Sequence, residues 1–308
     1  MKIIRKINIL RDFGLKFFAA DFLSSNIRIP QLTARWKDKV FIELLKEKYG
    51  YVIGRHINKK PKMQNVEAPF IWSMWWQGTD NLPEVVKMCF REIQKHRGSH
   101  PFTIITEDNY RDYISLPEYI TDGLNNGTIS RTHFSDIVRM YLLSRYGGMW
   151  IDATVLVTRD IPEEFFGMNY CTLRRPTNLR EYDVPLRRWC ISVQSARPEC
   201  PLCEFVLDMW LEYWKTQRFL ADYVMTDYFF ALAYETLPEC RRLLEAVPLG
   251  NYAYDDLQHV LASKFNQEKF DAMNRDTQFF KLTYKRDFPK EINGHETFYG
   301  HLCSLYGE

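Results

Sequence analysis

The sequence predicts a mixed α/β fold in which helices pack around one largely parallel sheet. From residue 69 onwards, short apolar segments typical of buried strands alternate with segments of helical periodicity, and this alternation is typical of parallel sheets. With 308 residues, of which 46% are hydrophobic, the chain can bury a sizeable core as one large domain or two small ones.

The N-terminal part, residues 1–60, is predicted to be a separate helical segment. We expect a basic amphipathic helix over residues 1–24 and a second helix over residues 32–50. The polar stretch 57–68 is the best linker candidate. The main domain is therefore predicted to span residues 61–308.

Positive charge is concentrated in this N-terminal segment. Residues 1–60 hold 14 Lys and Arg against 5 Asp and Glu, although the whole chain has a net charge of only +2. The rest of the chain has neither a basic stripe nor a known nucleic-acid-binding motif, which argues against a nucleic-acid partner. Residues 1–24 are expected either to pack on the main domain or to contact an anionic membrane surface peripherally.

The main domain begins with alternating strands and helices. The expected elements are a strand (69–76), a loop (77–81), a helix (83–97), a second strand (101–106), a short helix ending near 114 and another beginning near 117.

The most informative stretch is 130–157, which predicts a buried helix followed by a buried strand. Ser130 is a good N-cap, and the helix after it carries apolar side chains on most sides. Gly147 and Gly148 end the helix, because glycine alone adopts left-handed backbone angles without strain. Residues 149–157 then predict a single strand that is apolar on both faces except at two positions.

The pattern loosens beyond residue 160. We expect strands at 170–174, 189–194 and 279–284, and helices at 201–215, 222–234 and 296–306.

Cysteine usage and the N-terminal sequence predict the cellular location. The seven cysteines show no repeating framework, and the pair Cys200 and Cys203 has no second pair, so we expect ordinary free thiols in a reducing compartment. Charges interrupt every hydrophobic run in residues 1–23, which argues against a signal peptide or a membrane span. These features predict a cytoplasmic protein, with peripheral contact at the inner face of the cell membrane as the variant.

Three charged residues fit poorly in a buried helix and strand. Asp136 and Arg139 are three residues apart, so they share a helix face that also carries core side chains. Asp152 interrupts a strand that otherwise excludes water, and a buried carboxylate must be paired, bound to metal or protonated. A structural ion pair is one interpretation. Three charges in one short helix–strand unit favour the other, a functional site.

The expected chemistry of this site is binding of a ligand and a hard cation. Ligands of such sheets lie beyond the carboxyl ends of the strands, where the loop at Gln77 and Gly78 and the turn around Asp152 would meet. Residues two apart in a strand face the same way, so Asp152 and Thr154 would present oxygens on one side. Such oxygens suit Mg²⁺ or Mn²⁺.

Several motifs of this region occur together. They are Ile71-Trp-Ser-Met-Trp-Trp-Gln-Gly78, Ile104-Ile-Thr106, Phe134-Ser-Asp-Ile-Val-Arg139, Leu142-Leu143, Tyr146-Gly-Gly148 and Trp150-Ile-Asp-Ala-Thr154. In combination they resemble the capsular polysaccharide synthesis family of bacterial glycosyltransferases, which is related to the sugar-transferase group with a DxD motif. The resemblance covers roughly residues 69–165 well and the remainder loosely.

The resemblance implies a GT-A-like (Rossmann-like) fold, a nucleotide-diphosphate sugar donor and a divalent metal. It assigns Asp136 and Arg139 to the hydroxyls of the donor sugar. Asp152 matches the first acid of the DxD motif, which faces the ribose and the metal, whereas Thr154 stands in place of the second acid. The usual direct metal ligand is therefore missing. The candidate ligands of Mn²⁺ or Mg²⁺ in this chain are Asp152, Thr154 and, from the C-terminal part, His301, with His295 and Asp227 as alternatives to His301.

The same resemblance assigns the loop after the first strand to the donor nucleotide. Trp75, Trp76, Gln77 and Gly78 match the loop that in relatives lies against the base and the ribose. An aromatic ring there can stack on uracil. Two ordinary core tryptophans are the equal alternative.

The function implied by the resemblance is a glycosyltransferase of hexosyltransferase type. It would extend a surface glycan of capsular or O-antigen type, with retention of configuration, on a lipid-linked or oligosaccharide acceptor. The alternative is a catalytically inactive glycan-binding or scaffolding subunit of the same fold, which Thr154 supports. A metal-dependent phosphotransferase or nucleotidyltransferase is disfavoured, because the sequence lacks a glycine-rich phosphate cradle.

Overall fold

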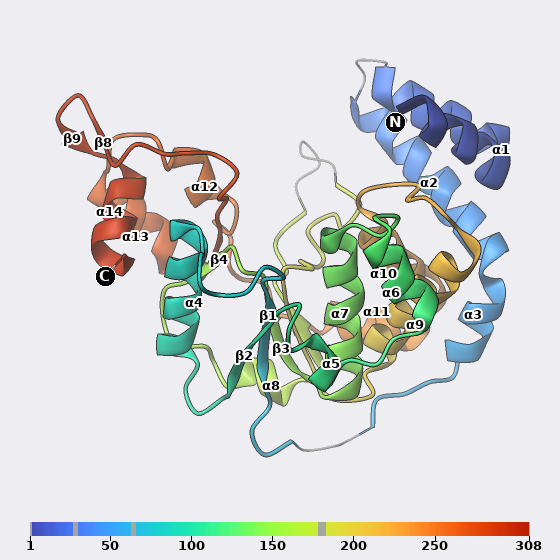
Figure 1. The fold of residues 1–308 in the computed structure, drawn as a ribbon, viewed down its shortest axis with the longest axis horizontal. Helices are drawn as coiled ribbons and strands as arrows, with labels where there is room; N and C mark the ends of the chain where they lie inside the picture. Colours follow the sequence, from blue (N-terminus) through green and yellow to red (C-terminus); the bar gives the residue numbers. More distant parts are fainter. Residues whose placement is uncertain (1, 27–29, 63–65, 178–182, 308) are drawn as a thin grey trace.

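In the computed structural model, residues 2–26, 30–62, 66–177 and 183–307 are described. Within them, a five-stranded sheet with the order β2-β1-β3-β6-β5 forms the centre of the molecule (Figure 1). Its strands are β1 (Ile71–Met74), β2 (Phe102–Ile105), β3 (Gly148–Ile151), β5 (Tyr170–Thr172) and β6 (Val193–Ala196). β1 is parallel to β2 and β3, whereas β6 is antiparallel to β3 and β5. Within this sheet β6 alone runs against the others, so the sheet is largely parallel, as predicted.

Helices and two small sheets complete the described part of the chain. The helices are α1 (Lys2–Asn26), α2 (Pro30–Lys48), α3 (Gly50–His56), α4 (Glu84–His96), α5 (Tyr110–Tyr113), α6 (Glu118–Asn125), α7 (Arg131–Arg145), α8 (Glu164–Gly167), α9 (Pro201–Thr216), α10 (Met225–Thr236), α11 (Pro238–Glu245), α12 (Asp256–Val260), α13 (Gln267–Arg275) and α14 (Phe298–Tyr306). The small sheets pair β4 (Val155–Val157) with β7 (Phe279–Lys281) and β8 (Glu291–Ile292) with β9 (His295–Glu296).

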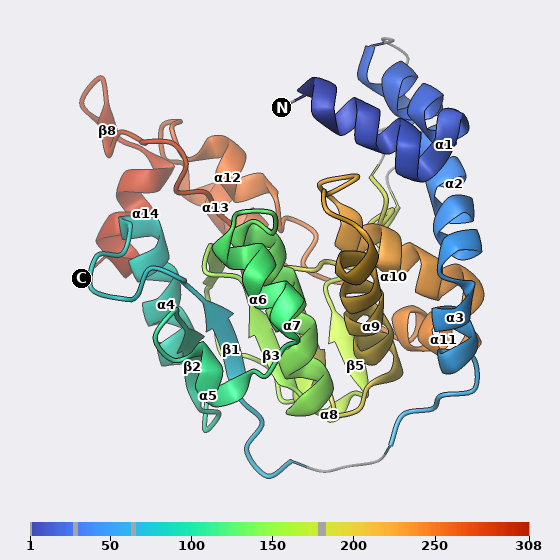
Figure 2. The same cartoon turned by 45° about the vertical axis from the view of Figure 1, so that its right-hand side comes forward.

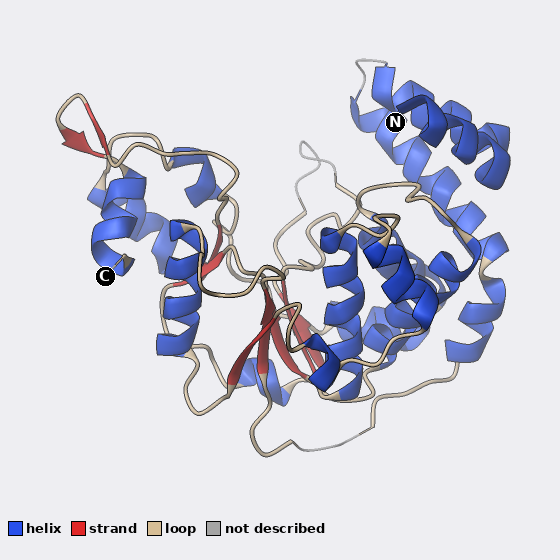
Figure 3. Ribbon diagram, viewed as in Figure 1, coloured by secondary structure: helices blue, strands red, loops and turns tan. Residues whose placement is uncertain are grey.

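Helices cover both faces of the central sheet, which explains its continuously apolar strands. Trp72 and Trp150 belong to the core that the sheet shares with α7 and α9. Their neighbours Ile71 and Met149 point the opposite way and pack with α4. Figure 3 shows α4 and α7 on opposite sides of the strands. A strand buried on both faces cannot alternate between apolar and polar residues.

Helix α7 begins and ends where the sequence predicts. The Ser130 hydroxyl accepts a hydrogen bond from the backbone N–H of His133 over 3.3 Å. Gly147 and Gly148 follow the helix with φ values of +66° and +90°. A Cβ on Gly148 would lie 2.1 Å from the Phe70 carbonyl oxygen, so the close approach of the chain before β1 also requires glycine.

The single strand predicted over 149–157 is wrong. β3 ends at Ile151, and a turn follows in which the Val155 N–H donates to the Asp152 carbonyl over 2.9 Å. β4 then leaves the central sheet and pairs with β7. Asp152 and Thr154 therefore do not share one strand face. The sequence does not reveal the turn, because β4 is as deeply buried as β3 and has the same apolar composition.

Helices α1 to α3 pack against the helical side of the molecule (Figure 2). Phe13 of α1 meets Phe219 edge to face, with ring centroids 6.0 Å apart, and Lys37 of α2 forms a 2.8 Å ion pair with Asp222. The helix predicted over 32–50 corresponds to α2, which ends at Lys48, and α3 follows it as a separate helix. None of the helices in the described ranges has both the length and the apolar character that crossing a bilayer requires.

The C-terminal segment forms a smaller unit beside α4 (Figure 1). Apolar residues of α12, α13, α14 and β7 share a cluster with Val85 and Met88 of α4. Helices α11, α12 and α13 were not predicted, because elements of 8, 5 and 9 residues offer only one or two turns in which a helical period can be recognised. The strand predicted at 189–194 instead lies at 193–196.

All seven cysteines lie in the described residues and are free thiols. Cys200 and Cys203 are buried at the beginning of α9, which agrees with the prediction that they are ordinary structural thiols.

Candidate functional site

A cavity of about 360 Å³ opens beyond the carboxyl ends of β1 and β3, beside the first turns of α7 and α10. This is the edge of the sheet at which a ligand was predicted. Asp136, Arg139, Asp152 and Thr154 all line the cavity. Its volume falls in the range of small-molecule sites, about 300–1,000 Å³.

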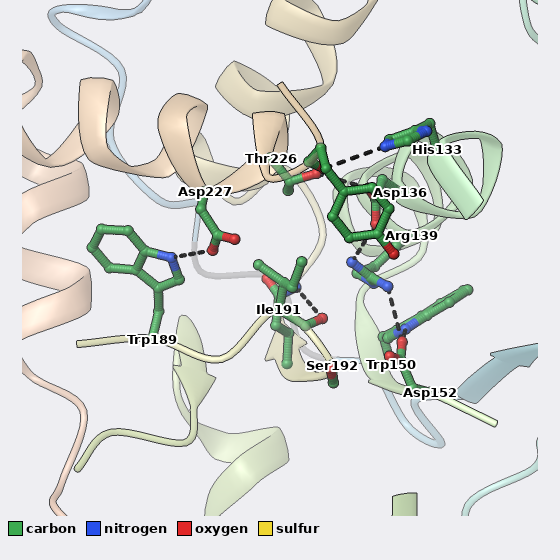
Figure 4. Close-up of polar contacts among 12 residues, drawn as sticks. His133, Asp136, Arg139, Trp150, Asp152, Trp189, Ile191, Ser192, Thr226 and Asp227 are labelled. Carbon is green, nitrogen blue, oxygen red and sulfur yellow. Dashed lines mark hydrogen bonds and ion pairs between the residues drawn. The ribbon is translucent and has the colours of Figure 1, made fainter. Parts of the chain in front are cut away.

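An ion-pair network joins α7 to the turn after β3. Arg139 donates from Nη1 to Asp136 Oδ1 and from Nη2 to Asp152 Oδ1, each over 2.9 Å (Figure 4). Asp136 and Arg139 are 7% and 3% exposed, so water screens the network little. The helical spacing of three explains the first pair, and the two-glycine turn returns the chain as β3 and brings Asp152 to the same guanidinium.

Asp152 is the most heavily engaged carboxylate of the cavity. Its Oδ1 also accepts from the Trp150 indole Nε1 over 2.8 Å, and its Oδ2 accepts from Lys281 Nζ over 2.8 Å. Burial raises the pKa of Asp152. The charges of Lys281 and Arg139 and the hydrogen bonds from Lys281 and Trp150 outweigh that effect and hold the pKa well below its usual range. Asp152 is therefore ionised at every physiological pH.

Lys281 is a site residue that the sequence reasoning missed. It is the last residue of β7, 129 residues beyond Asp152. A signal was present, because Lys281 is the charged residue of an otherwise apolar strand, as Asp152 is in the predicted strand before it. The pairing of β4 with β7 carries this lysine to the turn, since Val155 is in register with Lys281.

The other side of the cavity is formed by the first turn of α10. Thr226 Oγ1 donates to Asp136 Oδ2 over 2.9 Å, so α10 is tied to the same network. Asp227 accepts from the Trp189 indole Nε1 over 2.9 Å and is 7% exposed. Burial, reinforced by the charge of Asp136, raises the pKa of Asp227 to about 7. Asp227 can thus exchange a proton near neutral pH.

The loop after β1 provides aromatic and polar groups at the cavity. Trp75, Trp76 and Gln77 line it, whereas Gly78 follows them in a turn that its positive φ of +83° allows. Trp76 is buried against Tyr110 and Phe134. Trp76 thus packs in the core and also lines the cavity, so its assignment to the donor nucleotide stays a prediction.

Trp75 is the more exposed of the two tryptophans in this loop and can contact a ligand. It is half-buried, and Tyr284 of the loop after β7 meets it edge to face at 5.2 Å between ring centroids. Tyr284 is 43% exposed and also lines the cavity. Together the two rings form an aromatic wall against which a flat ligand group can pack.

Two of the three candidate third metal ligands are not brought to the cavity. His301 stacks on Phe265 with ring centroids 3.7 Å apart and pairs with Glu296 over 3.2 Å. His295 lies in the exposed β8–β9 hairpin. Both histidines belong to the C-terminal unit. The sequence does not show how far this unit lies from Asp152. Asp227, the remaining candidate, does line the cavity.

The residues present do not fit a divalent cation. Both oxygens of Asp152 are occupied by N–H donors, two of which belong to cationic side chains. Thr154 offers only a neutral hydroxyl. Among the side chains that the structure describes, no three His, Cys, Asp or Glu residues are grouped as a metal site. The predicted Mn²⁺ or Mg²⁺ stays a prediction.

Comparison with known families identifies the relatives of this chain. The sequence model of the family described as capsular polysaccharide synthesis protein matches residues 24–302. The chain belongs to this family. The motifs around Asp136, Arg139 and Asp152 lie inside the matched range, as do Trp75 and Lys281.

Two further comparisons accompany the family match. Comparison of this chain with curated protein sequences gives no match. Among solved structures it is similar to the "PaToxG Glycosyltransferase", with 13% sequence identity and a TM-score of 0.37 over 78% of this chain and 94% of that one.

Proposed function

We propose that the chain is a glycosyltransferase of GT-A type that moves a sugar from a nucleotide-diphosphate sugar to a surface glycan. One observation carries the proposal. The buried network of Asp136, Arg139 and Asp152 lines a cavity at the carboxyl edge of the sheet, where α/β folds bind nucleotides. Membership of the capsular polysaccharide synthesis family supports a surface glycan as the acceptor.

The donor sugar and base would occupy different parts of the cavity. Asp136 and Arg139 are rigidly paired, and their lone pairs and N–H groups suit the hydroxyls of a sugar. Trp75 and Tyr284 supply the aromatic wall for the base. Asp227 lies on the opposite side of the cavity from Asp152 (Figure 4), where it can accept a hydrogen bond from a sugar or acceptor hydroxyl.

The proposed reaction exchanges one bond at the anomeric carbon for another. The bond from this carbon to the diphosphate oxygen breaks, and its electron pair leaves with the diphosphate. The acceptor oxygen bonds to the carbon from the same side, and its proton passes to the departing diphosphate, so configuration is retained. Fixed charges in a site with little water stabilise the charge separation that develops.

We also propose that α1 lets the protein contact an anionic membrane, where a lipid-linked acceptor would lie. Ile4 and Ile7 are 64% and 60% exposed before the kink of α1 at Gly14, and Leu15, 70% exposed, and the exposed Lys16 follow it. Exposed apolar and basic side chains on this kinked helical segment suit an interfacial position. The wild type should sediment with phosphatidylglycerol vesicles, whereas the double variant Ile4→Glu, Ile7→Glu should stay in the supernatant. Equal fractions of the two proteins in the vesicle pellet would exclude this contact.

Turnover of nucleotide sugars tests the main proposal. The full chain is incubated with UDP-, GDP- and dTDP-sugars, with Mn²⁺ or with EDTA, and release of the nucleoside diphosphate is measured. One donor should be turned over, and Asp152→Asn should lower that rate at least about 100-fold while the protein stays folded at the assay temperature, which circular dichroism checks. Lys285→Ala, an exposed change outside the cavity lining, is the control.

Two results would overturn the proposal. Absence of turnover with every donor in both conditions would exclude a glycosyltransferase that uses common donors. Glycan binding without any thermal stabilisation by nucleotides would instead favour the catalytically inactive glycan-binding subunit.

A further inference from the structure

We propose that Lys281, rather than a divalent cation, supplies the positive charge that binds the donor diphosphate and stabilises it as the leaving group. The inference rests on the proposed function, because it names the group that holds the diphosphate in the same cavity. Its basis is the position of Lys281 against Asp152, the residue that the resemblance assigns to a metal.

The ammonium group of Lys281 occupies the place beside Asp152 where a cation is expected. Nζ lies 2.8 Å from Asp152 Oδ2 and 3.5 Å from Ser192 Oγ. The carboxylate oxygen that would face a metal thus already faces a full positive charge. A metal would have to displace this lysine and bind beside the Arg139 guanidinium, which repels it.

The backbone around Lys281 holds the lysine against the turn that carries Asp152. The Lys281 N–H donates to the Tyr254 carbonyl and the Leu282 N–H donates to the Thr154 carbonyl, each over 2.8 Å. These bonds fix the end of β7 on the Asp152–Thr154 turn. The site is therefore built before a ligand arrives, as electrostatic stabilisation of a leaving group requires.

Lys281 is better suited than Arg139 to reach a phosphate. The Arg139 side chain is 4% exposed, and one N–H of each terminal nitrogen is held by Asp136 or Asp152. The Lys281 side chain is 26% exposed and lines the cavity. An ammonium has three donors, so one remains for a phosphate oxygen while the others keep Asp152 and Ser192.

The charge balance of the site agrees with this role. Without a ligand, Arg139 and Lys281 offset Asp136 and Asp152. The departing diphosphate gains negative charge when the bond to the anomeric carbon breaks, and Lys281 contacts it without losing its own proton. Thr154, in place of a second acid, removes a negative charge that would repel the diphosphate, so its presence is consistent with a cavity whose cation is a side chain.

Nucleoside diphosphate binding tests this role of Lys281. Titration calorimetry with UDP, GDP and dTDP is performed on the full chain, once with EDTA and once with Mn²⁺. The wild type should bind one of them with similar Kd in both conditions. Lys281→Ala should raise that Kd about 10- to 100-fold, the size expected for one hydrogen bond to a charged group. Lys281→Arg, which keeps the charge, should recover most of the affinity.

Control variants separate this inference from folding and from the proposed function. Lys285→Ala, four residues along the same segment and exposed, should bind like the wild type. If Lys281→Ala does not fold, Lys281→Gln, which keeps a hydrogen bond without the charge, must show the same loss. Binding that appears only with Mn²⁺, or unchanged affinity in the Lys281 variants, would overturn the inference and leave the proposed function standing. Failure of every nucleoside diphosphate to bind in either condition would refute both.

Discussion

Asp152 and Asp227 lie on opposite sides of one cavity and differ in the charge that their surroundings impose. Asp152, on the sheet side, contacts Arg139 and Lys281, and its pKa is held well below the usual range. Asp227, on the helical side, has one indole hydrogen bond and no cation within bonding distance among the described residues, and burial raises its pKa to about 7.

This difference shows how one cavity can hold two carboxylates with separate tasks. Asp227 is buried and Asp152 is largely buried, so desolvation raises the pKa of each and cannot distinguish them. The distinction comes from the cations, which meet only at the turn after β3. Asp152 on the sheet side is thereby a fixed negative charge, whereas Asp227 on the helical side can take or release a proton near neutral pH.

Replacement of Arg139 should cause the largest loss of stability, because this residue forms ion pairs with both Asp136 and Asp152. Arg139→Ala leaves Asp136 buried and without its cation, and it removes one of the two cations on Asp152. The free energy of unfolding should fall by about 3–5 kcal/mol, the typical effect of breaking a buried ion pair. Denaturant unfolding measures this change. Arg145→Ala, an exposed change at the end of the same helix, is the control. An equal loss of stability in this variant would show that the loss in Arg139→Ala does not come from the broken ion pairs.

Replacement of Asp227 tests the helical side of the cavity and should cause a smaller change in stability, which depends on pH. The folded protein binds the Asp227 proton more tightly than the unfolded chain, because the pKa is raised to about 7 from an ordinary value of 3.8. The contribution of this group to stability is therefore complete below about pH 4 and declines as pH rises through about 7. Asparagine does not titrate, so Asp227→Asn should gain stability relative to the wild type, on the order of 3 kcal/mol between about pH 5 and about pH 8.

Unfolding of Asp227→Asn and the wild type at about pH 5 and about pH 8 checks this sign. The difference between the two proteins should grow with pH, whereas Asp256→Asn, at an exposed site, serves as the reference. A difference that stayed constant over this range would mean that Asp227 is ionised throughout, and the comparison with Asp152 would lose its basis.

The smallest change in stability is expected when Trp189, whose indole N–H donates a hydrogen bond to Asp227, is replaced. Trp189→Phe removes a donor that favours the ionised carboxylate, so the pKa of Asp227 should rise further above its ordinary value. The additional loss of stability between about pH 5 and about pH 8 should be about 1 kcal/mol. Trp210→Phe is a matched control, because the Trp210 indole is buried without a hydrogen-bond partner among the described residues. If both variants change alike with pH, the indole has no role at Asp227.

Local sequence signals predicted the first half of the main domain. The N-cap at Ser130, the glycine pair after α7 and the apolar strands on either side act through contacts between near neighbours, so they can be identified without knowledge of the fold. The pair of Asp136 and Arg139 belongs to the same class, since helical spacing alone brings the two side chains together. The edge of the sheet that carries the cavity also followed from the order of strands and helices.

Tertiary structure alone decided which partners these residues meet. Lys281 reaches Asp152 across 129 residues, and Thr226 reaches Asp136 across 90, because β4 leaves the central sheet to pair with β7 and α10 packs beside α7. The turn that separates β3 from β4 is hidden in a continuous apolar run, since burial in either sheet requires the same residues. Sequence thus located the acidic residues of the cavity, and the registers of distant elements determined their charge states, because these depend on the cations that long-range packing brings to them.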